Sequence, residues 1–311
     1  MTEPTLEYRR LFDPSLPAPP PKAASGAGFG DRREAAEYVY TEQIVLAVNV
    51  AMATTRPLLV LGPAGSGKSS LAPDIARRMG WDLYPEVISS RTEAKDLLWR
   101  FDALRRLRDA QIGDSNNDLK RYVRPGTLWR AFDPKSAADF EGAMKRTPLN
   151  RGAVVLLDEI DKAEPDTPND LLVPLGAGTF TVTDVEPALE IVNRRTQRPL
   201  VVITSNRERD LPPAFVRRCV ALQLQAPSAK RLVAIATAHF GAQPAELHER
   251  LWRYFRDARR DADRDDVALP STAEYLDAVY AAEQLGIGDE GVTWQALMDA
   301  TLTKWRDGGV A

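Results

Sequence analysis

The chain has 311 residues, a formal net charge of −3 and a pI near 5.7. This length accommodates one large core and a smaller one, and the slightly acidic balance gives no global signature of nucleic-acid binding. The single cysteine, Cys219, excludes an intrachain disulfide and suits a reducing compartment. No apolar run reaches the length of a membrane span, and the N-terminus lacks a secretory pattern, so we expect a cytoplasmic protein.

The N-terminal part of the chain has the composition of an arm. Residues 1–31 hold a proline-rich tract followed by alanine, glycine and serine, which predicts a flexible segment. Within it, Glu7–Phe12 is a candidate for a short docking anchor. A helix is predicted over residues 32–55 because apolar residues there form a broad helical set.

An apolar strand predicted over residues 57–61 runs straight into the pattern G-x-x-x-x-G-K-S, which is a phosphate-binding loop. A helix is predicted from Ser69 to Met79, with apolar residues at helical spacing. The glycines permit backbone angles that let successive N–H groups face an anion. The nucleotide-binding residues are therefore predicted to be Gly62, Pro63, Ala64, Gly65, Ser66, Gly67, Lys68, Ser69 and Ser70.

Two residues at the start of the helix have distinct predicted roles. Lys68 is expected to reach the β- and γ-phosphates of a nucleoside triphosphate, and the Ser69 hydroxyl is expected to ligate Mg²⁺. The positive end of the helix dipole adds to the attraction for phosphate.

The next segment is expected to be mostly helical. A strand is predicted at residues 86–89, followed by a helix over 91–107 in which Leu97, Phe101, Leu104 and Leu107 share one face. A further short helix is predicted at residues 126–132, closing before Pro134.

Two carboxylates follow the apolar strand predicted at residues 153–157. At the end of a buried parallel strand, Asp158 is expected to hold Mg²⁺. Glu159 is expected to orient and polarise the attacking water. A site that only binds nucleotide has little use for the adjacent glutamate, so its presence favours hydrolysis.

Two further polar motifs follow apolar strands. After a helix at residues 165–175 and a hairpin that pairs 178–183 with 188–192, a buried strand at 199–204 leads to Asn206. This amide is a candidate partner for the γ-phosphate and the lytic water. Arg217 and Arg218 follow a short helix, and a guanidinium there is a candidate for neutralising charge on the γ-phosphate.

The chain is therefore predicted to have an α/β fold with a parallel five-stranded sheet flanked by helices, the fifth strand lying at residues 220–224. After residue 226 no strand-like run remains, and residues 228–306 read as several helices. We expect an arm at 1–31, a nucleotide-binding core with inserted hairpins at 32–226, and a helical lid subdomain at 227–311.

The order of these motifs resembles an AAA+ ATPase, and more narrowly the MoxR-like branch. The features suggesting that branch are the segments 124–132 and 158–163, together with the hairpin that begins at Gly178 before Asn206. The resemblance covers about residues 35–285. One departure concerns the lid, where residues 269–276 contain no arginine at the place where the family often has its sensor 2 arginine.

The resemblance implies Mg²⁺-dependent hydrolysis of ATP by a homo-oligomeric ring, commonly a hexamer. Such a ring remodels or matures a client protein as a chaperone, often with a partner carrying a von Willebrand A domain. It also implies that Arg217 or Arg218 acts on the site of a neighbouring subunit. ATP rather than GTP follows from the family alone.

Other functions remain open on the sequence. A nucleic-acid-dependent motor or a restriction-type NTPase could use the basic stretch between Arg100 and Arg124, although interleaved aspartates favour a solvated surface there. A nucleotide-gated scaffold with little turnover is a further alternative. A small-molecule kinase would leave Asn206 and Arg217 unexplained.

Overall fold

The computed structural model describes residues 7–18, 38–112, 118–142, 150–241, 245–264, 269–288 and 290–302. Much of the predicted arm lies outside these ranges, as do residues 32–37 of the helix expected from residue 32. Residues 38–41 are not helical, and the helix begins at Glu42 because the Thr41 side chain caps it by accepting from the Ile44 N–H. The chain forms two compact units. The first comprises Met1–Pro20, Tyr40–Leu61 and Lys68–Gln223, and the second comprises Pro21–Val39, Gly62–Gly67 and Leu224–Ala311.

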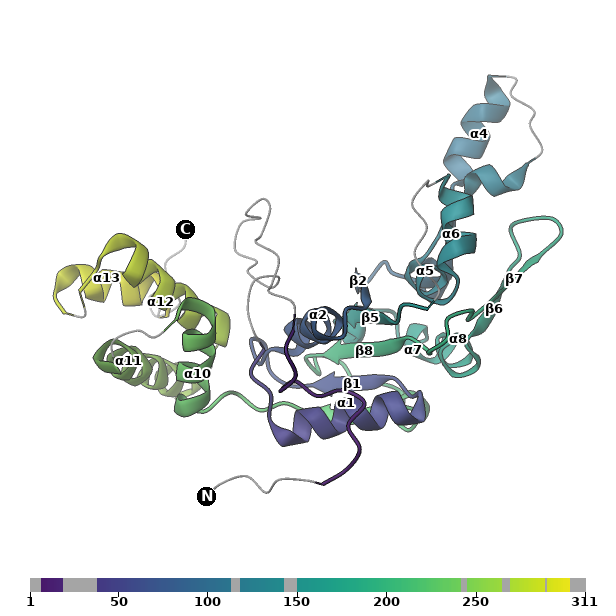
Figure 1. Cartoon of the computed structure of the whole chain (residues 1–311). Coiled ribbons are helices and arrows are strands. Elements are labelled where there is room, and N and C mark those ends of the chain that lie inside the picture. The colour runs from purple at the N-terminus through teal and green to yellow at the C-terminus, as the bar shows by residue number, and fades with distance from the viewer. Residues whose placement is uncertain are drawn as a thin grey trace. The chain divides into compact units, whose positions relative to one another are not determined.

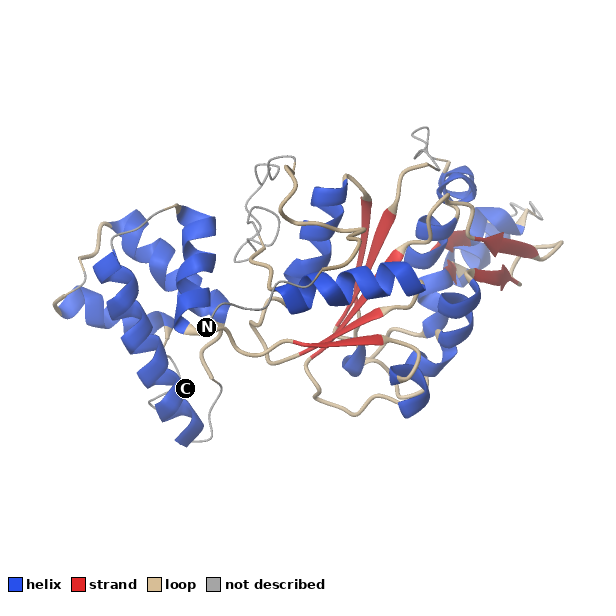
Figure 2. Cartoon of the chain, turned by 60° about the horizontal axis from the view of Figure 1, so that its bottom comes forward, coloured by secondary structure: helices blue, strands red, loops and turns tan. Residues whose placement is uncertain are grey.

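The first unit is built on a five-stranded parallel sheet in the order β2-β5-β8-β1-β9 (Figure 2). The strands are β1 (Leu58–Leu61), β2 (Asp82–Val87), β5 (Ala153–Asp158), β8 (Leu200–Ser205) and β9 (Val220–Gln223). Every residue of β5 and β8 is buried, as expected for central parallel strands covered on both faces. The predicted fold class is thus confirmed, and the strand expected at residues 86–89 begins earlier, at Asp82.

Helices cover the sheet and fill the connections between its strands (Figure 1). They are α1 (Glu42–Thr54), α2 (Lys68–Met79), α3 (Ala94–Leu98), α4 (Ala103–Gln111), α5 (Thr127–Phe132), α6 (Pro134–Glu141), α7 (Thr167–Asp170), α8 (Leu172–Ala177) and α9 (Pro213–Val216). Two 3₁₀ turns lie at Leu119–Tyr122 and Ile160–Lys162. The helix expected over residues 165–175 is therefore two short helices, α7 and α8.

The N-terminal segment docks on α1, as expected for Glu7–Phe12. Phe12 is 1% exposed, and its backbone N–H donates to Asn49 Oδ1 at 2.9 Å while its carbonyl accepts from Asn49 Nδ2 at 2.8 Å. Arg10 pairs with Glu42 at 2.8 Å. A buried amide that satisfies both backbone groups of one residue fixes the segment on the helix.

Two small antiparallel sheets of the described residues are inserted between the elements of the core. The predicted hairpin is confirmed: β6 (Thr179–Val182) pairs antiparallel with β7 (Leu189–Val192), with Phe180 opposite Ile191. A second small sheet joins β3 (Trp99–Phe101) to β4 (Val123–Pro125). The prediction of one helix over residues 91–107 is therefore wrong: α3 ends at Leu98, and the chain continues as the strand β3.

The contacts of Trp99 explain why the helix predicted over residues 91–107 is interrupted. Trp99 stacks on Phe180 with ring centroids 5.9 Å apart, and its Nε1 donates to Asp184 at 2.6 Å. These contacts and the β4 pairing hold the chain extended where periodicity favours a helix. Because α4 restarts afterwards, Leu104 and Leu107 are 81% and 58% exposed instead of buried.

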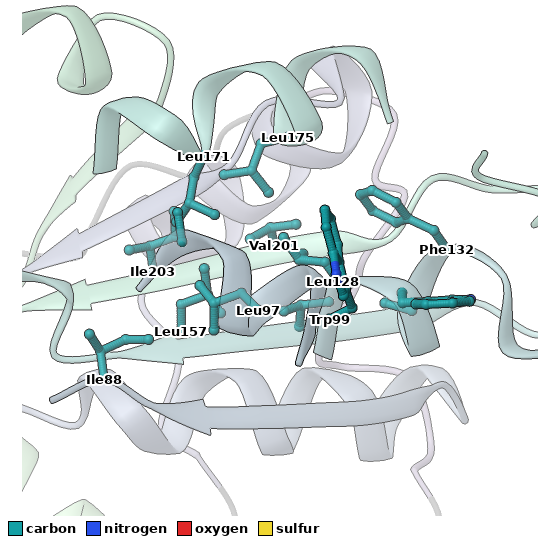
Figure 3. Close-up of a cluster of buried hydrophobic side chains, with 14 of the residues drawn as sticks. Ile88, Leu97, Trp99, Leu128, Phe132, Leu157, Leu171, Leu175, Val201 and Ile203 are labelled. Carbon is teal, nitrogen blue, oxygen red and sulfur yellow. The ribbon is translucent and has the colours of Figure 1, made fainter. Parts of the chain in front are cut away.

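The main core of the first unit lies between the sheet and the helices of the inserted segments. Figure 3 shows the side chains of Leu157, Val201 and Ile203 from the two central strands gathered with those of the surrounding segments. The labelled partners are Ile88, Leu97, Trp99, Leu128, Phe132, Leu171 and Leu175. Burial of this apolar surface fixes the central strands and hence the positions of the residues at their ends.

The second unit contains the helices that the sequence predicts after residue 226. They are α10 (Ala229–Phe240), α11 (Ala245–Arg264), α12 (Thr272–Leu285) and α13 (Val292–Thr301). A separate hydrophobic core holds them together, with Leu232, Leu251, Phe255, Tyr275 and Met298 each at most 1% exposed. No helix of the described ranges is both long and apolar enough to cross a membrane.

Candidate functional site

The phosphate-binding loop Gly62–Gly67 joins β1 to α2 and belongs to the second unit. Gly65 and Gly67 have φ angles of +71° and +87°, a region that only glycine adopts at little cost. The Ser66 N–H donates to the Pro63 carbonyl at 3.3 Å and closes the turn. The Ser66 hydroxyl is buried and has no hydrogen-bond partner among the described residues. A cradle with an unsatisfied buried donor fits a phosphate group.

Within the same unit, Gly65 lies directly against the N-terminus of α12. A Cβ atom on Gly65 would approach the Ser271 Cβ to 2.4 Å. Ser271 and Glu274 form a capping box, in which the Ser271 N–H donates to Glu274 at 2.7 Å. The neighbouring Thr272 Oγ1 is buried without a hydrogen-bond partner in the described part of the chain. Residues 269–276, which lack the sensor 2 arginine of the family, therefore present two hydroxyl side chains at the N-terminus of α12.

Lys68 is the first residue of α2 and is 6% exposed. Burial lowers the pKa of its ammonium group, and the negative charges of Asp158, Asp161 and Glu159 partly offset that effect. A buried lysine surrounded by carboxylates is thus present where the sequence predicts the phosphate-binding lysine. Ser70 is half-buried in the first turn of the same helix.

Ser69 and Asp158 meet in the first unit, as the sequence predicts for a shared magnesium site. The Ser69 hydroxyl donates to Asp158 Oδ1 at 2.7 Å, and Asp158 is 4% exposed at the end of β5. A hydroxyl and a carboxylate are hard oxygen ligands, so the pair fits Mg²⁺ held mainly by water and phosphate. No group of three or more histidine, cysteine or acidic side chains arranged to hold a metal is found in the described ranges.

Thr204, which the sequence analysis did not single out, connects the carboxylate of Asp158 to the backbone of Glu159. Its hydroxyl donates to Asp158 Oδ1 at 2.6 Å and accepts from the Glu159 N–H at 2.9 Å. Glu159 has a φ of +63°, a conformation uncommon for a non-glycine residue. The hydrogen bond from its backbone fixes that turn. The polar Thr204 at the end of an otherwise apolar strand was the available signal in the sequence.

Glu159 is held between two side chains. Asn206 Nδ2 donates to Glu159 Oε1 at 3.3 Å, and Lys162 Nζ donates to Oε2 at 2.7 Å. The hydrogen bond to Glu159 raises the pKa of Lys162. The structure therefore brings Glu159 and Asn206 together, and Lys162 is an additional partner that the sequence analysis missed. Its position three residues after Glu159 was the signal, because this spacing places two side chains together in a helical turn.

Arg217 and Arg218 stand apart from this cluster. Both are exposed after α9, and neither side chain makes a hydrogen bond or ion pair with the described residues. The Arg217 carbonyl accepts from Arg56 at 2.8 Å. The structure of one chain thus does not bring the two guanidinium groups to Asp158 and Glu159.

The fold and this cluster define the class of P-loop nucleotide-binding proteins. A family model described as "AAA domain (dynein-related subfamily)" matches residues 57–219, more than half of the chain, and the chain belongs to this family. AAA domains are generally ATPases and bind nucleotide, typically with Mg²⁺. No curated protein sequence matches the chain.

Among solved structures, the chain is similar to a proline-to-glycine mutant of RuvB from Thermotoga maritima. The identity is 16%, the match covers 81% of this chain and 71% of that chain, and the TM-score is 0.40. A likeness of this size supports no conclusion about function.

Proposed function

We propose that the chain is a Mg²⁺-dependent ATPase that works as a ring and remodels a partner protein. The observation that carries the proposal is the contact of Ser69 with Asp158 at 2.7 Å, next to the contact of Asn206 with Glu159 at 3.3 Å. A site for binding alone needs the first contact. The second supplies an oriented carboxylate beside the position of the phosphates, and such a group serves hydrolysis.

Each residue has a distinct role in this proposal. Gly62–Gly67 and Lys68 bind the triphosphate, while Ser69 and Asp158 would hold the metal ion, whose charge stabilises the negative charge on the phosphate oxygens. Glu159 accepts a proton from the attacking water and orients it. Asn206 holds the Glu159 carboxylate in place by donating to its Oε1 atom.

The ring is proposed from the two exposed arginines. A guanidinium that has no partner among the described residues of its own chain is available to the nucleotide of a neighbouring subunit, where it would stabilise developing charge. A homo-oligomeric ring of the MoxR-like branch, commonly a hexamer, accounts for Arg217 and Arg218 in this way. A client protein, with a von Willebrand A-type partner as one candidate, would then be remodelled by the ring.

The proposal is tested by comparing ATP hydrolysis and ATP binding in wild type and Glu159→Gln. The amide keeps the shape of the side chain and removes its basicity, so we expect turnover to fall by about 100-fold or more while ATP binding is retained. Glu164→Gln, an exposed change on the same connection, is the matched control. Unchanged turnover in Glu159→Gln would instead support a nucleotide-gated scaffold.

Assembly and partner are tested separately. Light scattering with ATP should show a mass several times that of one chain. Glu159→Gln loaded with ATP should retain the client protein in a pulldown, because the ring cannot proceed past the ATP state. A single-chain mass with and without ATP would contradict the ring.

A nucleic-acid-dependent motor receives less support from the geometry. Arg100 pairs with Asp96 and Glu86 at 3.3 Å and 3.4 Å, and Arg105 and Arg108 both lie 3.9 Å from Asp109. Three arginines of the basic stretch are thus paired with carboxylates of their own chain. Strong, salt-sensitive stimulation of ATP hydrolysis by duplex DNA would favour the motor over the protein-remodelling ring.

A further inference from the structure

Asp161 is a buried carboxylate that the proposed chemistry does not use. It lies in the 3₁₀ turn Ile160–Lys162 after the Asp158-Glu159 pair and is 3% exposed. Its Oδ2 atom accepts a hydrogen bond from the backbone N–H of Glu208 at 2.9 Å. Its Oδ1 atom is buried and has no hydrogen-bond partner among the described residues. Removing a carboxylate from water is costly, so its position requires a physical explanation.

The Glu208 N–H belongs to the turn that presents Asn206. The turn follows β8, and Arg207 at its centre has a φ of +63°, in a region that non-glycine residues rarely adopt. The Arg207 N–H donates to Ser205 Oγ at 3.0 Å. The turn is therefore fixed by two backbone donors that follow Asn206: the Arg207 N–H donates to Ser205, and the Glu208 N–H donates to Asp161.

The hydrogen bond between Glu208 and Asp161 connects the segments that follow β5 and β8. Asp161 follows β5 together with Glu159, whereas Glu208 follows β8 together with Asn206. Hence the bond from Glu208 N to Asp161 ties the turn of Asn206 to the turn of Glu159, 47 residues earlier in the chain. The contact between Asn206 and Glu159, at 3.3 Å, is the longer of the two. A geometry that depends on a side chain with two free torsions benefits from a fixed backbone on both sides.

Asp161 also lies near a positive charge. Asp161 is one of three carboxylates whose negative charge acts on the buried Lys68 ammonium. The lysine thus supplies a nearby positive charge. Backbone and charge together account for a carboxylate here better than packing does, since an apolar side chain would leave the Glu208 N–H unsatisfied.

We propose that Asp161 is a positioning residue that holds Asn206 against Glu159 through the backbone N–H of Glu208, and so controls the rate of hydrolysis without contributing to ATP affinity. The inference rests on the proposed ATPase activity. It differs from a purely structural role, which would change stability and leave the turnover of the folded protein unaltered.

The test compares Asp161→Ala with Asp161→Asn. The alanine removes the acceptor, and a displacement of Asn206 of this kind should reduce kcat by roughly 10-fold to 100-fold. The asparagine keeps an oxygen that accepts from the Glu208 N–H, so its kcat should stay within about threefold of wild type. The dissociation constant for ATP, measured directly with a fluorescent analogue, should change by less than about threefold in both variants.

Two controls separate positioning from folding. Asp170→Ala removes an exposed carboxylate from the neighbouring helix α7 and should leave kcat unchanged. In a background of Asn206→Ala, the further change Asp161→Ala should have little additional effect on kcat, because the group that Asp161 positions is already absent. Where Asp161→Ala does not give folded protein, Asp161→Leu fills the space of the asparagine variant and lacks its acceptor.

The outcomes are distinguishable. If the wild type does not hydrolyse ATP, the proposed function fails. If the wild type is active and folded Asp161→Ala or Asp161→Leu keeps wild-type kcat, the positioning role is wrong. Equal losses in Asp161→Asn and Asp161→Ala, or full additivity with Asn206→Ala, would also overturn it.

Discussion

The carboxyl ends of β5 and β8 differ sharply from the inserted helix α4. At the strand ends, polar side chains are buried and satisfy one another: Asp158 is 4% exposed and accepts from both Ser69 and Thr204. On α4, apolar side chains face solvent, with Leu104 81% exposed. In Figure 1, α4 extends away from the five-stranded sheet of its own unit. The strand ends thus hold polar side chains in a defined geometry, while α4 contributes little to the core.

We expect some mutations of this chain to affect chemistry and others to affect stability. The largest expected effect belongs to the exposed pair Arg217 and Arg218. Replacing both with alanine should reduce ATP hydrolysis by roughly 1,000-fold if they act in a neighbouring site. Because both side chains are exposed, the free energy of unfolding should change by less than about 0.5 kcal/mol. Turnover and thermal unfolding of the same preparation check both parts, and unaltered turnover would remove the arginines from the site.

The hydroxyl of Thr204 is expected to matter for both stability and rate. Thr204→Val keeps the shape of the side chain but removes the donor to Asp158 and the acceptor for the Glu159 N–H. Leaving these buried groups unsatisfied should cost about 1–3 kcal/mol of unfolding free energy, and turnover should fall by about 10-fold or more. Thr181→Val, at an exposed position of β6, is the matched control in urea unfolding and in the hydrolysis assay. Equal behaviour of the two variants would show that the cluster tolerates the loss.

The lowered pKa of Lys68 predicts a pH dependence of ATP affinity. Burial lowers the pKa of this lysine below its usual value of about 10.4, so its charge is lost as pH rises through the lowered pKa. A bound polyanion favours the charged form, so binding should take up protons in the alkaline range and affinity should fall there. By the same linkage, burial of the lysine costs the folded state most below its lowered pKa, and stability recovers as pH rises from there towards the unfolded value.

Calorimetry in two buffers of different ionisation enthalpy, at several pH values between about 8 and 10, measures this proton uptake. Lys68→Arg should abolish the uptake, because a guanidinium stays charged throughout this range. An affinity that is constant up to pH 10, with no proton uptake by the wild type, would contradict the assignment of Lys68 to the phosphates.

The smallest effect is expected on α4. Changing Leu104 and Leu107 to serine should alter the free energy of unfolding by less than about 0.5 kcal/mol for each site. By contrast, Leu157→Ala in the fully buried strand β5 should cost about 2–5 kcal/mol. Urea unfolding of the three variants checks the contrast. A loss above 2 kcal/mol on α4 would mean that this helix packs on something that one isolated chain does not show.

Local patterns in the sequence predict much of the fold and the site. The phosphate loop, the strand before Asp158 and the hairpin around Phe180 each depend on residues close together in the chain, and each is found at the expected place. Thr204 was missed because its role depends on the pairing of β5 with β8, in which Leu157 lies opposite Ile203. That register joins residues 46 positions apart in the chain, so a polar residue at the end of an apolar strand is a signal that does not by itself identify its partners.

The helix predicted over residues 91–107 failed for a related reason. Its periodicity is real, but Trp99 finds its partners at Asp184 and Phe180 on a distant connection. Asp102 then starts a new helix by accepting from the Arg105 N–H at 2.9 Å. The apolar residues have the spacing of one buried helix face, and the sequence alone does not show the tertiary contacts that interrupt the helix.

The central claim is that the loop ending at Ser69 and the carboxylate of Asp158 serve one magnesium-bound triphosphate. The most direct test is the affinity for ATP with and without Mg²⁺, measured by calorimetry for wild type and Asp158→Asn. We expect Mg²⁺ to strengthen ATP binding to wild type and to have little effect on Asp158→Asn, while both bind metal-free ATP alike. An equal gain from Mg²⁺ in the two proteins, or no heat of binding for wild type with ATP and Mg²⁺, would contradict the claim.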